Sequence, residues 1–341
     1  MPETVRSFAK INIGLCIGRL RPDGFHELRT VYQTIALHDV IRVEVKRGTG
    51  IEIRCADPRV PRDDSNTCYR MVDIAMAALK ARGRAVVNIE KRLPVRGGLG
   101  GASSNAVAAL VALERVLKKK LPGPEKLRIA AAVGSDLPLF LIGGTVLGLG
   151  RGEEVYPLPD MPALPWVIAT PAIAISTPQA FRDWDARGQQ PDRADARTAI
   201  AAKLTGSTCS DRITEFGRAV SAWLGSQYRD RIRSSSGVLA HGKGRAESPL
   251  LELVHTGIEN DFEQVVFPQY PELRELKRVL ECAGAVYASL SGSGSAIYGL
   301  FSSQRKAEQA VAKLRRQGTA ALVTTTLTRL EYWKQVWRQQ D

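Results

Sequence analysis

The glycine-rich segment PVRGGLGGASSN, at residues 94–105, holds the residue types best suited to chemistry. Its four glycines let the backbone approach a ligand closely and point successive N–H groups toward it. Apolar residues at Ala106, Leu110 and Leu113 predict a helix directly after this segment. The positive N-terminal end of that helix would face the same ligand as the N–H groups of the loop. The first turn of that helix holds no Asp or Glu, although an acidic residue there would stabilise it. The pattern favours a phosphate-binding loop over an ordinary tight turn.

Lys10 and Asp136 are the two charged residues that could complete such a site. Lys10 interrupts the polar face of an alternating strand, where a lysine usually lies in solvent. Asp136 precedes a long apolar stretch, where it could cap a helix or a turn. These ordinary interpretations are favoured when each residue is considered alone. Beside a phosphate loop, however, phosphoryl transfer needs a carboxylate that orients or deprotonates a hydroxyl and a cation that stabilises developing charge.

A second segment of glycines and serines, SLSGSGS at residues 289–295, joins two predicted strands. Such a segment can be a flexible hairpin. It can also form a second backbone wall that closes on the substrate or on the nucleotide. The sequence leaves both interpretations open.

The first half of the chain is predicted to form a sheet that leads into the glycine-rich loop. Strict alternation over residues 9–17 predicts a strand that covers a core with one face. Further short strands predict an antiparallel sheet, at residues 31–37, 40–45 and 51–53. Ser65 or Asn66 can cap a helix that runs to about Ala81, and residues 85–89 predict the strand that enters the loop.

The second half of the chain predicts the β-α-β-β-α-β order of a ferredoxin-like split unit. The expected strands lie at residues 166–175, 285–289, 296–301 and 320–326, and the expected helices at residues 249–266, 271–283 and 303–316. The stretch of residues 187–247 is polar and rich in arginine, with weak periodicity apart from a helix at 213–224. It is predicted to be an insertion in the second domain.

Length and composition limit the classes of protein. A chain of 341 residues with 44% hydrophobic and 24% charged residues is typical of a globular protein of two domains. The net charge of +13 favours anionic partners, but the basic residues are scattered, so nucleic acid ranks behind small phosphorylated substrates. Five cysteines without a C-x-x-C pair, and an N-terminus without an apolar signal, predict a cytoplasmic protein with no membrane partner.

Taken together, the loop at residues 94–105 and the SGSGS at 291–295 resemble the GHMP kinase superfamily of small-molecule kinases. Further segments resemble the branch of it that acts on a cytidyl-diphosphate-linked methylerythritol, in the non-mevalonate pathway of isoprenoid (terpenoid) biosynthesis. They are AKIN at 9–12, RPDGFHEL at 21–28, GSDLP at 134–138, GLGRGE at 148–153 and NDFE at 260–263. The DGFHEL part is the most specific, because other members of the superfamily lack it.

The resemblance implies a two-domain α+β fold with the active site between the domains. An S5-like, ATP-binding N-terminal domain would cover residues 1–163, and a ferredoxin-like C-terminal domain would cover residues 164–341, with the insertion at about 187–247. The resemblance also implies an ATP- and Mg-dependent phosphotransferase that phosphorylates the 2-hydroxyl of the cytidyl diphosphate substrate. The metal ligands and the oligomeric state stay unknown at this point.

The same resemblance implies roles for individual residues. Lys10 and Asp136 would be the catalytic pair. Asn12, Phe25 and His26 would face the cytidyl substrate, and Phe181 would stack on its cytosine, although it is equally suited to a core. The ATP phosphates would be held by Pro94, Val95, Arg96, Gly97, Gly98, Leu99, Gly100, Gly101, Ala102, Ser103 and Ser104. Phe25 replaces the family's usual tyrosine, and Ala102 replaces a common glycine.

Two alternative functions are compatible with parts of the sequence. One is another GHMP small-alcohol kinase, for homoserine or a sugar, against which the DGFHEL segment argues. The other is a non-catalytic, basic, S5-like protein that binds nucleic acid. Such a protein would not need Lys10, Asp136 and the glycine loop together, and its RNA binding would depend steeply on salt.

Overall fold

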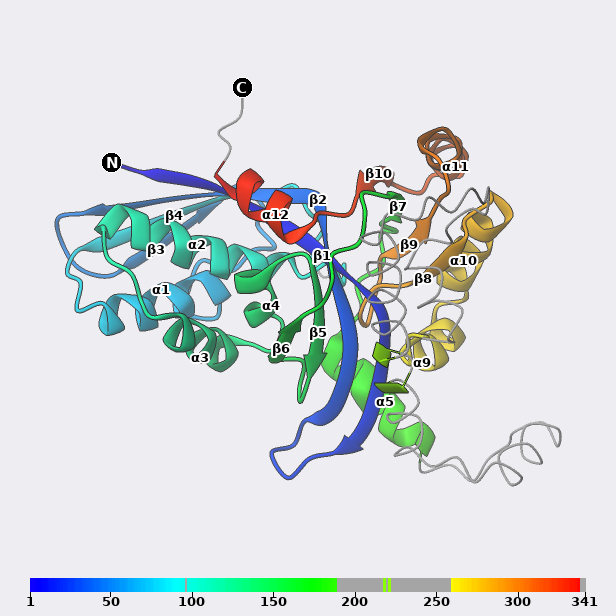
Figure 1. The fold of residues 1–341 in the computed structure, drawn as a ribbon, viewed down its shortest axis with the longest axis horizontal. Coiled ribbons are helices and arrows are strands. Elements are labelled where there is room, and N and C mark those ends of the chain that lie inside the picture. Colours follow the sequence, from blue (N-terminus) through cyan, green and yellow to red (C-terminus); the bar gives the residue numbers. More distant parts are fainter. Residues whose placement is uncertain (96, 189–216, 219, 222–258, 338–341) are drawn as a thin grey trace, which may run out of the picture.

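The computed structural model describes residues 1–95, 97–188, 217, 218, 220, 221 and 259–337. Two lobes lie side by side, and each is built on its own β-sheet (Figure 1). The longest strands, β1 (Glu3–Leu20) and β2 (His26–Lys46), run from the first lobe down between the lobes and end in a hairpin near α5 (Thr177–Gly188). Within the described ranges, none of the helices has both the length and the apolar character needed to cross a membrane.

The sheet of the first lobe has the order β3-β4-β2-β5-β6, with β1 paired to β2. Its shorter strands are β3 (Ile51–Cys55), β4 (Arg84–Glu90), β5 (Thr145–Leu149) and β6 (Glu154–Pro157). The pairs are antiparallel, as predicted, except that β3 and β4 are parallel. A parallel pair needs a long crossover connection, and the helix between these two strands provides it.

Helices cover one face of this sheet (Figure 1). They are α1 (Thr67–Ala78), α2 (Gly101–Leu117), α3 (Gly123–Val133) and α4 (Leu137–Ile142). Of the two predicted caps, Ser65 and Asn66, it is Asn66 that caps α1, because its side chain accepts a hydrogen bond from the Cys68 N–H; the helix ends at Ala78, earlier than the predicted Ala81. The helix predicted after the glycine loop is α2.

The second lobe confirms the ferredoxin-like prediction. Its sheet has the order β10-β7-β9-β8 with antiparallel pairs. The strands are β7 (Pro165–Ala169), β8 (Tyr287–Leu290), β9 (Ile297–Leu300) and β10 (Ala321–Thr325). Among the described residues of this lobe, the helices besides α5 are α9 (Glu263–Gln269), α10 (Pro271–Cys282) and α11 (Gln304–Arg316).

Two predicted boundaries in this lobe are wrong. β7 ends at Ala169 rather than at 175, because Pro171 has no N–H for a sheet ladder. The helix predicted at residues 249–266 is not continuous, because residues 259–262 are not helical and α9 covers Glu263–Gln269; residues 249–258 lie outside the described part. The predicted insertion at 187–247 also lies almost wholly outside the described residues.

An apolar cluster joins the lobes. Ile11 and Ile13 of β1 belong to the same buried cluster as Trp166 of β7 and Tyr298 of β9. The opposite face of β1, which carries Lys10, is buried as well. The expectation that β1 covers a core with one face alone is therefore wrong, because both faces are covered by other parts of the protein.

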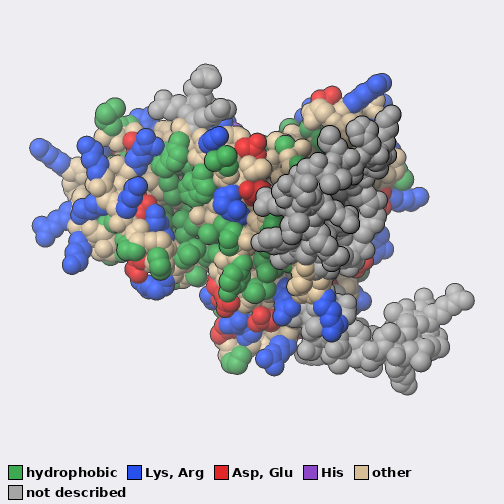
Figure 2. Space-filling view, viewed as in Figure 1, with side chains coloured by type: hydrophobic (Ala, Val, Ile, Leu, Met, Phe, Trp, Pro, Cys, Tyr) green, Lys and Arg blue, Asp and Glu red, His purple; other side chains and the backbone are tan. Residues whose placement is uncertain are grey.

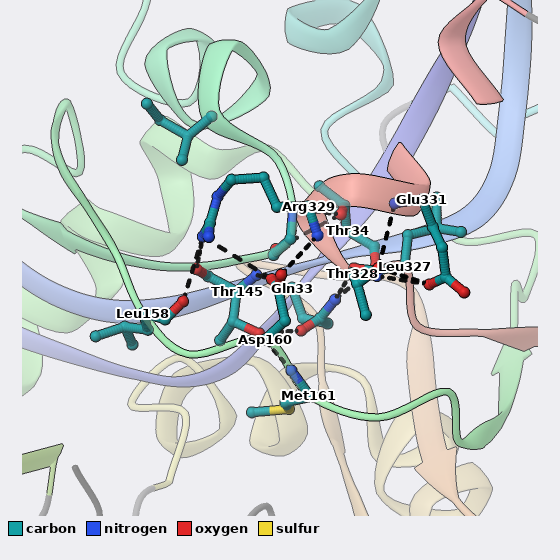
Figure 3. Close-up of polar contacts among 12 residues, drawn as sticks. Gln33, Thr34, Thr145, Leu158, Asp160, Met161, Leu327, Thr328, Arg329 and Glu331 are labelled. Atoms are coloured by element: carbon teal, nitrogen blue, oxygen red, sulfur yellow. Dashed lines mark hydrogen bonds and ion pairs between the residues drawn. The ribbon is translucent and has the colours of Figure 1, made fainter. Parts of the chain in front are cut away.

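The chain crosses between the lobes at a polar junction (Figure 3). Arg329 Nη2 donates to the carbonyls of Thr145 (3.0 Å) and Leu158 (3.3 Å), while the Arg329 N–H donates to Asp160 Oδ2 (2.9 Å). Gln33 of β2 donates to the carbonyl of Leu327 at 2.9 Å. These contacts tie the linker after β6 to the segment that leaves β10.

Helix α12 (Arg329–Val336) then returns to the first lobe. The Tyr332 hydroxyl donates to the Phe140 carbonyl at 2.8 Å, and Tyr332 and Val336 belong to the first lobe's buried cluster. The sequence boundary between domains, at residues 163 and 164, stays a prediction. What the structure adds is that the last described helix packs on the N-terminal lobe.

Candidate active site

Lys10 and Asp136, far apart in the sequence, come together in a cleft. Lys10 Nζ lies 3.4 Å from Asp136 Oδ2. Lys10 is only 3% exposed, whereas the Asp136 side chain is 34% exposed. Asp136 stands at the N-terminus of α4, but its side chain makes no capping hydrogen bond there. A solvated lysine and a capping side chain at Asp136 are therefore both wrong, although Asp136 does lie in the turn before α4.

Asn12 holds the lysine in place. Alternate residues of a strand share a face, so β1 places Asn12 beside Lys10. Lys10 Nζ donates to Asn12 Oδ1 at 2.6 Å, and Asn12 Nδ2 donates to Thr30 Oγ1 at 2.8 Å. The backbone is fixed too, because the Tyr298 hydroxyl donates to the Asn12 carbonyl at 2.6 Å. The ammonium group thus has a defined position before any ligand arrives.

Tyr32 holds the carboxylate, a role that the sequence analysis missed. It lies opposite Asn12 in the β1–β2 register, and its hydroxyl donates to Asp136 Oδ1 at 3.0 Å. Burial, reinforced by the charge of Asp136, raises the pKa of Tyr32 well above its usual value, so the hydroxyl stays protonated as a donor. A Cβ at Gly148 or Gly152 would collide with the tyrosine side chain. The glycines of the GLGRGE segment therefore make room for it.

The glycine-rich loop packs directly on Lys10. The Lys10 N–H donates to the Leu99 carbonyl at 3.0 Å. Gly100 precedes α2 with a φ of +68°, and a Cβ there would lie 2.9 Å from Lys10 Cγ and 3.0 Å from Phe140 Cζ. A residue with a side chain would strain this backbone and displace the lysine. As predicted, the first turn of α2 holds no acidic residue, and no side chain caps it.

The second glycine and serine segment is part of the same structure rather than a flexible hairpin. Ser291 Oγ donates to the Gly98 carbonyl at 3.0 Å, and the Ala296 N–H donates to the Gly97 carbonyl at 3.1 Å. Gly292 and Ser293 of this segment line the cleft that contains Lys10 and Asp136. The two loops therefore support each other from opposite lobes.

The NDFE segment fixes that second loop. Asn260 Nδ2 donates to the carbonyls of Leu290 (2.8 Å) and Gly292 (2.7 Å). Glu263 Oε1 accepts hydrogen bonds from Ser289 Oγ (2.7 Å) and from the Leu290 N–H (2.9 Å). This explains why the segment accompanies the SGSGS motif although the two are apart in sequence.

Aromatic residues gather at the β1–β2 hairpin and α5. The rings of His26 and Phe181 are stacked, with their centroids 5.1 Å apart and an interplanar angle of 7°. His26 Nε2 lies 2.8 Å from Asp185 Oδ1. Phe25 is exposed, and the Arg151 guanidinium lies 4.8 Å from the centre of its ring. The sequence analysis gave Asp185 and Arg151 no role, although Arg151 belongs to the GLGRGE segment that it singled out.

One cleft of about 620 Å³ is lined by both groups. It contains Lys10, Asn12 and Asp136, and also the aromatic residues Phe25, His26 and Phe181. The structure thus brings together all six of the residues predicted to be catalytic or to bind the substrate. Among the described residues, acidic, histidine and cysteine side chains form no cluster of three that could hold a metal ion by themselves.

A second cavity, of about 330 Å³, also borders the glycine loop. It is lined by most of the predicted phosphate residues, namely Pro94, Val95, Gly97, Gly98, Leu99, Gly100, Gly101, Ala102 and Ser103. Gly98 and Gly100 line both cavities, so the loop is where they meet. Arg96 lies outside the described residues.

Ser104 is the predicted phosphate residue that the structure places elsewhere. It is buried and does not line either cavity. Its hydroxyl lies 2.7 Å from Ser7 Oγ, so it faces β1 rather than the loop's open side.

Comparison with known proteins gives consistent matches. A model described as GHMP kinases N terminal domain matches residues 66–144, and one described as GHMP kinases C terminal matches residues 246–320. The 4-diphosphocytidyl-2-C-methyl-D-erythritol kinase of Solibacter usitatus is 35% identical over 335 residues, which are 98% of this chain and 92% of that one. The kinase of the same name from Acaryochloris marina is 33% identical over 306 residues, 89% of each chain.

A solved structure agrees with these relatives. The crystal structure of a 4-(cytidine 5'-diphospho)-2C-methyl-D-erythritol kinase has a TM-score of 0.67 and 26% identity, and the match covers 95% of this chain and 98% of the other. The fold and the superfamily implied by the sequence motifs are therefore confirmed. With these relatives matched over almost their whole length, the chain belongs to the GHMP kinases, and within them to the family of 4-diphosphocytidyl-2-C-methyl-D-erythritol kinases.

Proposed function

We propose that the chain transfers the γ-phosphoryl group of ATP to the 2-hydroxyl of 4-diphosphocytidyl-2-C-methyl-D-erythritol. The observation that carries the proposal is the Lys10–Asp136 pair, which shares one cleft with the aromatic residues of the hairpin. In the reaction the hydroxyl oxygen bonds to the γ-phosphorus, and the bond from that phosphorus to the bridging oxygen of ADP breaks. The hydroxyl proton passes to Asp136.

The contacts of the pair suit these roles. Asp136 Oδ1 is occupied by the Tyr32 hydroxyl, and Oδ2 lies near Lys10 Nζ, so the carboxylate is oriented while it stays open to the cleft. A carboxylate held in this way can accept the proton of an attacking hydroxyl. Lys10 supplies a fixed positive charge, and such a charge stabilises the negative charge that develops during transfer.

The glycine loop and the start of α2 are proposed to bind the ATP phosphates. Support comes from the uncapped N-terminus of α2, the absence of an acid in its first turn and the cavity beside it. Magnesium belongs to this proposal as the ion that neutralises charge on ATP. It commonly keeps several water ligands and binds through the phosphates of the substrate.

The far end of the cleft is proposed to bind the cytidyl group. Flat rings such as Phe181 and Phe25 stack favourably on a base. His26 can hydrogen-bond to the polar edge of cytosine, while Asp185 orients its ring. Arg151 is held against Phe25 and by Glu153, and it gives the cleft a positive charge suited to the diphosphate.

Domain roles and location complete the proposal. The N-terminal domain at residues 1–163 binds ATP, and the C-terminal domain at 164–341 closes the site with its glycine and serine loop. A kinase that consumes ATP fits a cytoplasmic location. The oligomeric state is not part of the proposal.

The nucleic-acid alternative has less support. In the view of Figure 2, Lys and Arg side chains are spread around the edge of the molecule, with hydrophobic side chains gathered nearer its centre. A nucleic-acid surface usually concentrates its basic side chains on one face or along one helix. RNA binding with a steep salt dependence, in the absence of any kinase activity, would favour the alternative.

A coupled assay of ADP release tests the proposed function. The purified protein is given Mg-ATP with the cytidyl substrate, homoserine, mevalonate or a sugar alcohol in separate reactions. Saturable ADP release is expected with the cytidyl substrate and to depend on Mg. Turnover of homoserine or mevalonate, with none of the cytidyl substrate, would move the assignment to another GHMP kinase.

A further inference from the structure

Asp39 is a buried carboxylate that neither the proposed chemistry nor the family motifs use. It lies on β2 opposite Ser7 of β1 and is fully buried. A buried carboxylate is costly unless several donors satisfy it. Asp39 has four such donors, three from residues 91–93 just before the glycine-rich segment and one from Asn105 at its end.

Three of the four donors come from the chain just before the loop. The backbone N–H groups of Arg92 and Leu93 both donate to Asp39 Oδ1, each at 2.7 Å. Lys91 Nζ donates to Oδ2 at 2.6 Å. These three residues follow β4 directly and lead into Pro94, the first residue of the loop.

The remaining donor is Asn105, the last residue of the glycine-rich segment. Asn105, in the second turn of α2, donates from Nδ2 to Asp39 Oδ2 at 3.0 Å. Asn105 is oriented in turn by Ser7, whose hydroxyl donates to Asn105 Oδ1 at 2.6 Å and lies 2.7 Å from Ser104 Oγ. The serine and asparagine that end the glycine-rich motif therefore face the strand beneath the loop.

We infer that Asp39 is a positioning residue for the ATP-phosphate loop, which it holds by tying the two ends of the loop to one carboxylate. The inference rests on the proposed function, since it takes the loop as the phosphate site. Holding the loop in its binding conformation before ATP arrives removes an ordering cost from binding. Without the anchor the loop would have to be ordered on binding, so Asp39 affects ATP affinity without touching ATP.

Asp39→Asn tests the anchor with little change in shape. The amide keeps one acceptor for the Arg92 and Leu93 N–H groups, but its NH₂ group faces two donors, Lys91 Nζ and Asn105 Nδ2. The hydrogen bond from Asn105 of α2 to residue 39 is then lost. The expected result is a rise of roughly 10- to 100-fold in the Kd of a non-hydrolysable ATP analogue, with the KM of the cytidyl substrate changed less than about twofold.

Glu114→Gln is the matched control. Glu114 is also buried, lies at the other end of α2, and accepts from a lysine, Lys126 (3.0 Å), and from a backbone N–H, that of Leu121 (2.7 Å). A merely structural role for Asp39 predicts that both variants lose stability and affect ATP binding alike. The anchor predicts that Glu114→Gln lowers the melting temperature but leaves the Kd of the ATP analogue unchanged.

Ser7→Ala keeps the test valid if Asp39→Asn does not fold. It removes the hydroxyl that orients Asn105 and should raise the Kd of the analogue about 3- to 10-fold, as expected for one neutral hydrogen bond. Calorimetric titration of the unmodified protein and of each variant with the ATP analogue measures these Kd values. Equal affinity for the analogue in the unmodified protein, Asp39→Asn and Ser7→Ala would overturn the anchor while leaving the kinase proposal intact. A failure of the unmodified protein to bind the analogue would overturn the phosphate site itself.

Discussion

Lys10 is a charge kept out of solvent, and its surroundings explain why that is tolerated. A buried ammonium is destabilising unless an opposite charge and hydrogen bonds compensate it. Asp136 provides the charge, and Asn12 Oδ1 provides the hydrogen bond. Because Asp136 is also open to the cleft, the pair is poised toward a ligand rather than sealed in the core.

Lys10→Met keeps the aliphatic stem and removes the charge. We expect turnover to fall roughly 10²- to 10³-fold, since one fixed donor to the developing negative charge is lost. Steady-state kinetics with both substrates, alongside thermal unfolding, measure the effect. Near-normal turnover in a folded variant would remove Lys10 from the chemistry.

Tyr32→Phe removes only the hydroxyl that orients Asp136. Turnover should fall about 3- to 30-fold with little change in either KM, because the carboxylate loses one donor but keeps its place. Tyr332→Phe is the control, since this buried hydroxyl donates to a backbone carbonyl, that of Phe140, instead. Equal turnover losses in the two variants would mean that Tyr32 has no special role.

The backbone conformation of the glycine-rich loop determines both the proposed phosphate site and the position of Lys10. Gly100 has a positive φ and is the residue just before α2. It also leaves room for the Lys10 side chain, which a Cβ at this position would contact too closely. A β-branched side chain resists that φ and would occupy the space next to Lys10.

Gly100→Val should therefore weaken ATP binding and lower turnover together, whereas loss of the Lys10 charge alone should act mainly on turnover. Gly123→Val is the control, because a Cβ at Gly123 meets no atom within 4 Å. Calorimetric titration with an ATP analogue checks the first effect. Unchanged affinity in folded Gly100→Val would show that the phosphate site lies elsewhere.

The sequence predicted those elements well whose formation depends on residues that are close together in the chain. The glycine loop followed by α2, the Asn66 cap and the ferredoxin-like order all depend on residues that are close in sequence. Helix α12 was missed although its signal was present, because Thr328 and Glu331 form a capping box. The parallel β3–β4 pair was missed because strand direction depends on the crossover between strands rather than on either strand alone.

Contacts between distant residues were beyond a single sequence. The Tyr32–Asp136 bond and the Asp39 anchor each join residues from different elements. The burial of Lys10 depends on loops that pack over β1. Alternation along β1 could place Lys10 on the polar face of the strand, but it could not show that this face is covered.

The two lobes form one catalytic unit because segments of each are embedded in the other. The SGSGS loop of the second lobe packs on the glycine loop of the first, and α12 returns to the first lobe's core. The junction in Figure 3, where Arg329 bridges the linker and β5, holds the crossing segments together.

Arg329→Ala tests the junction. We expect the free energy of unfolding to fall by about 1–3 kcal/mol, because the Thr145 and Leu158 carbonyls lose a charged donor. Chemical denaturation measures this, with Arg128→Ala as a control at an exposed ion pair whose loss should cost at most about 1 kcal/mol. Equal stability of the two variants would show that the junction adds nothing.

The most direct measurement of the central claim follows the product by phosphorus NMR, for the unmodified protein and for Asp136→Asn. With Mg-ATP and the cytidyl substrate, the unmodified protein should produce ADP and a new phosphomonoester at the 2-position of the methylerythritol group. Asp136→Asn should bind ATP normally but form this product roughly 10²- to 10⁴-fold more slowly, since the proton acceptor is lost. Combining Asp136→Asn with Lys10→Met should cost much less than the product of the two single losses. Undiminished product formation by folded Asp136→Asn, or no phosphomonoester from the unmodified protein, would contradict the account.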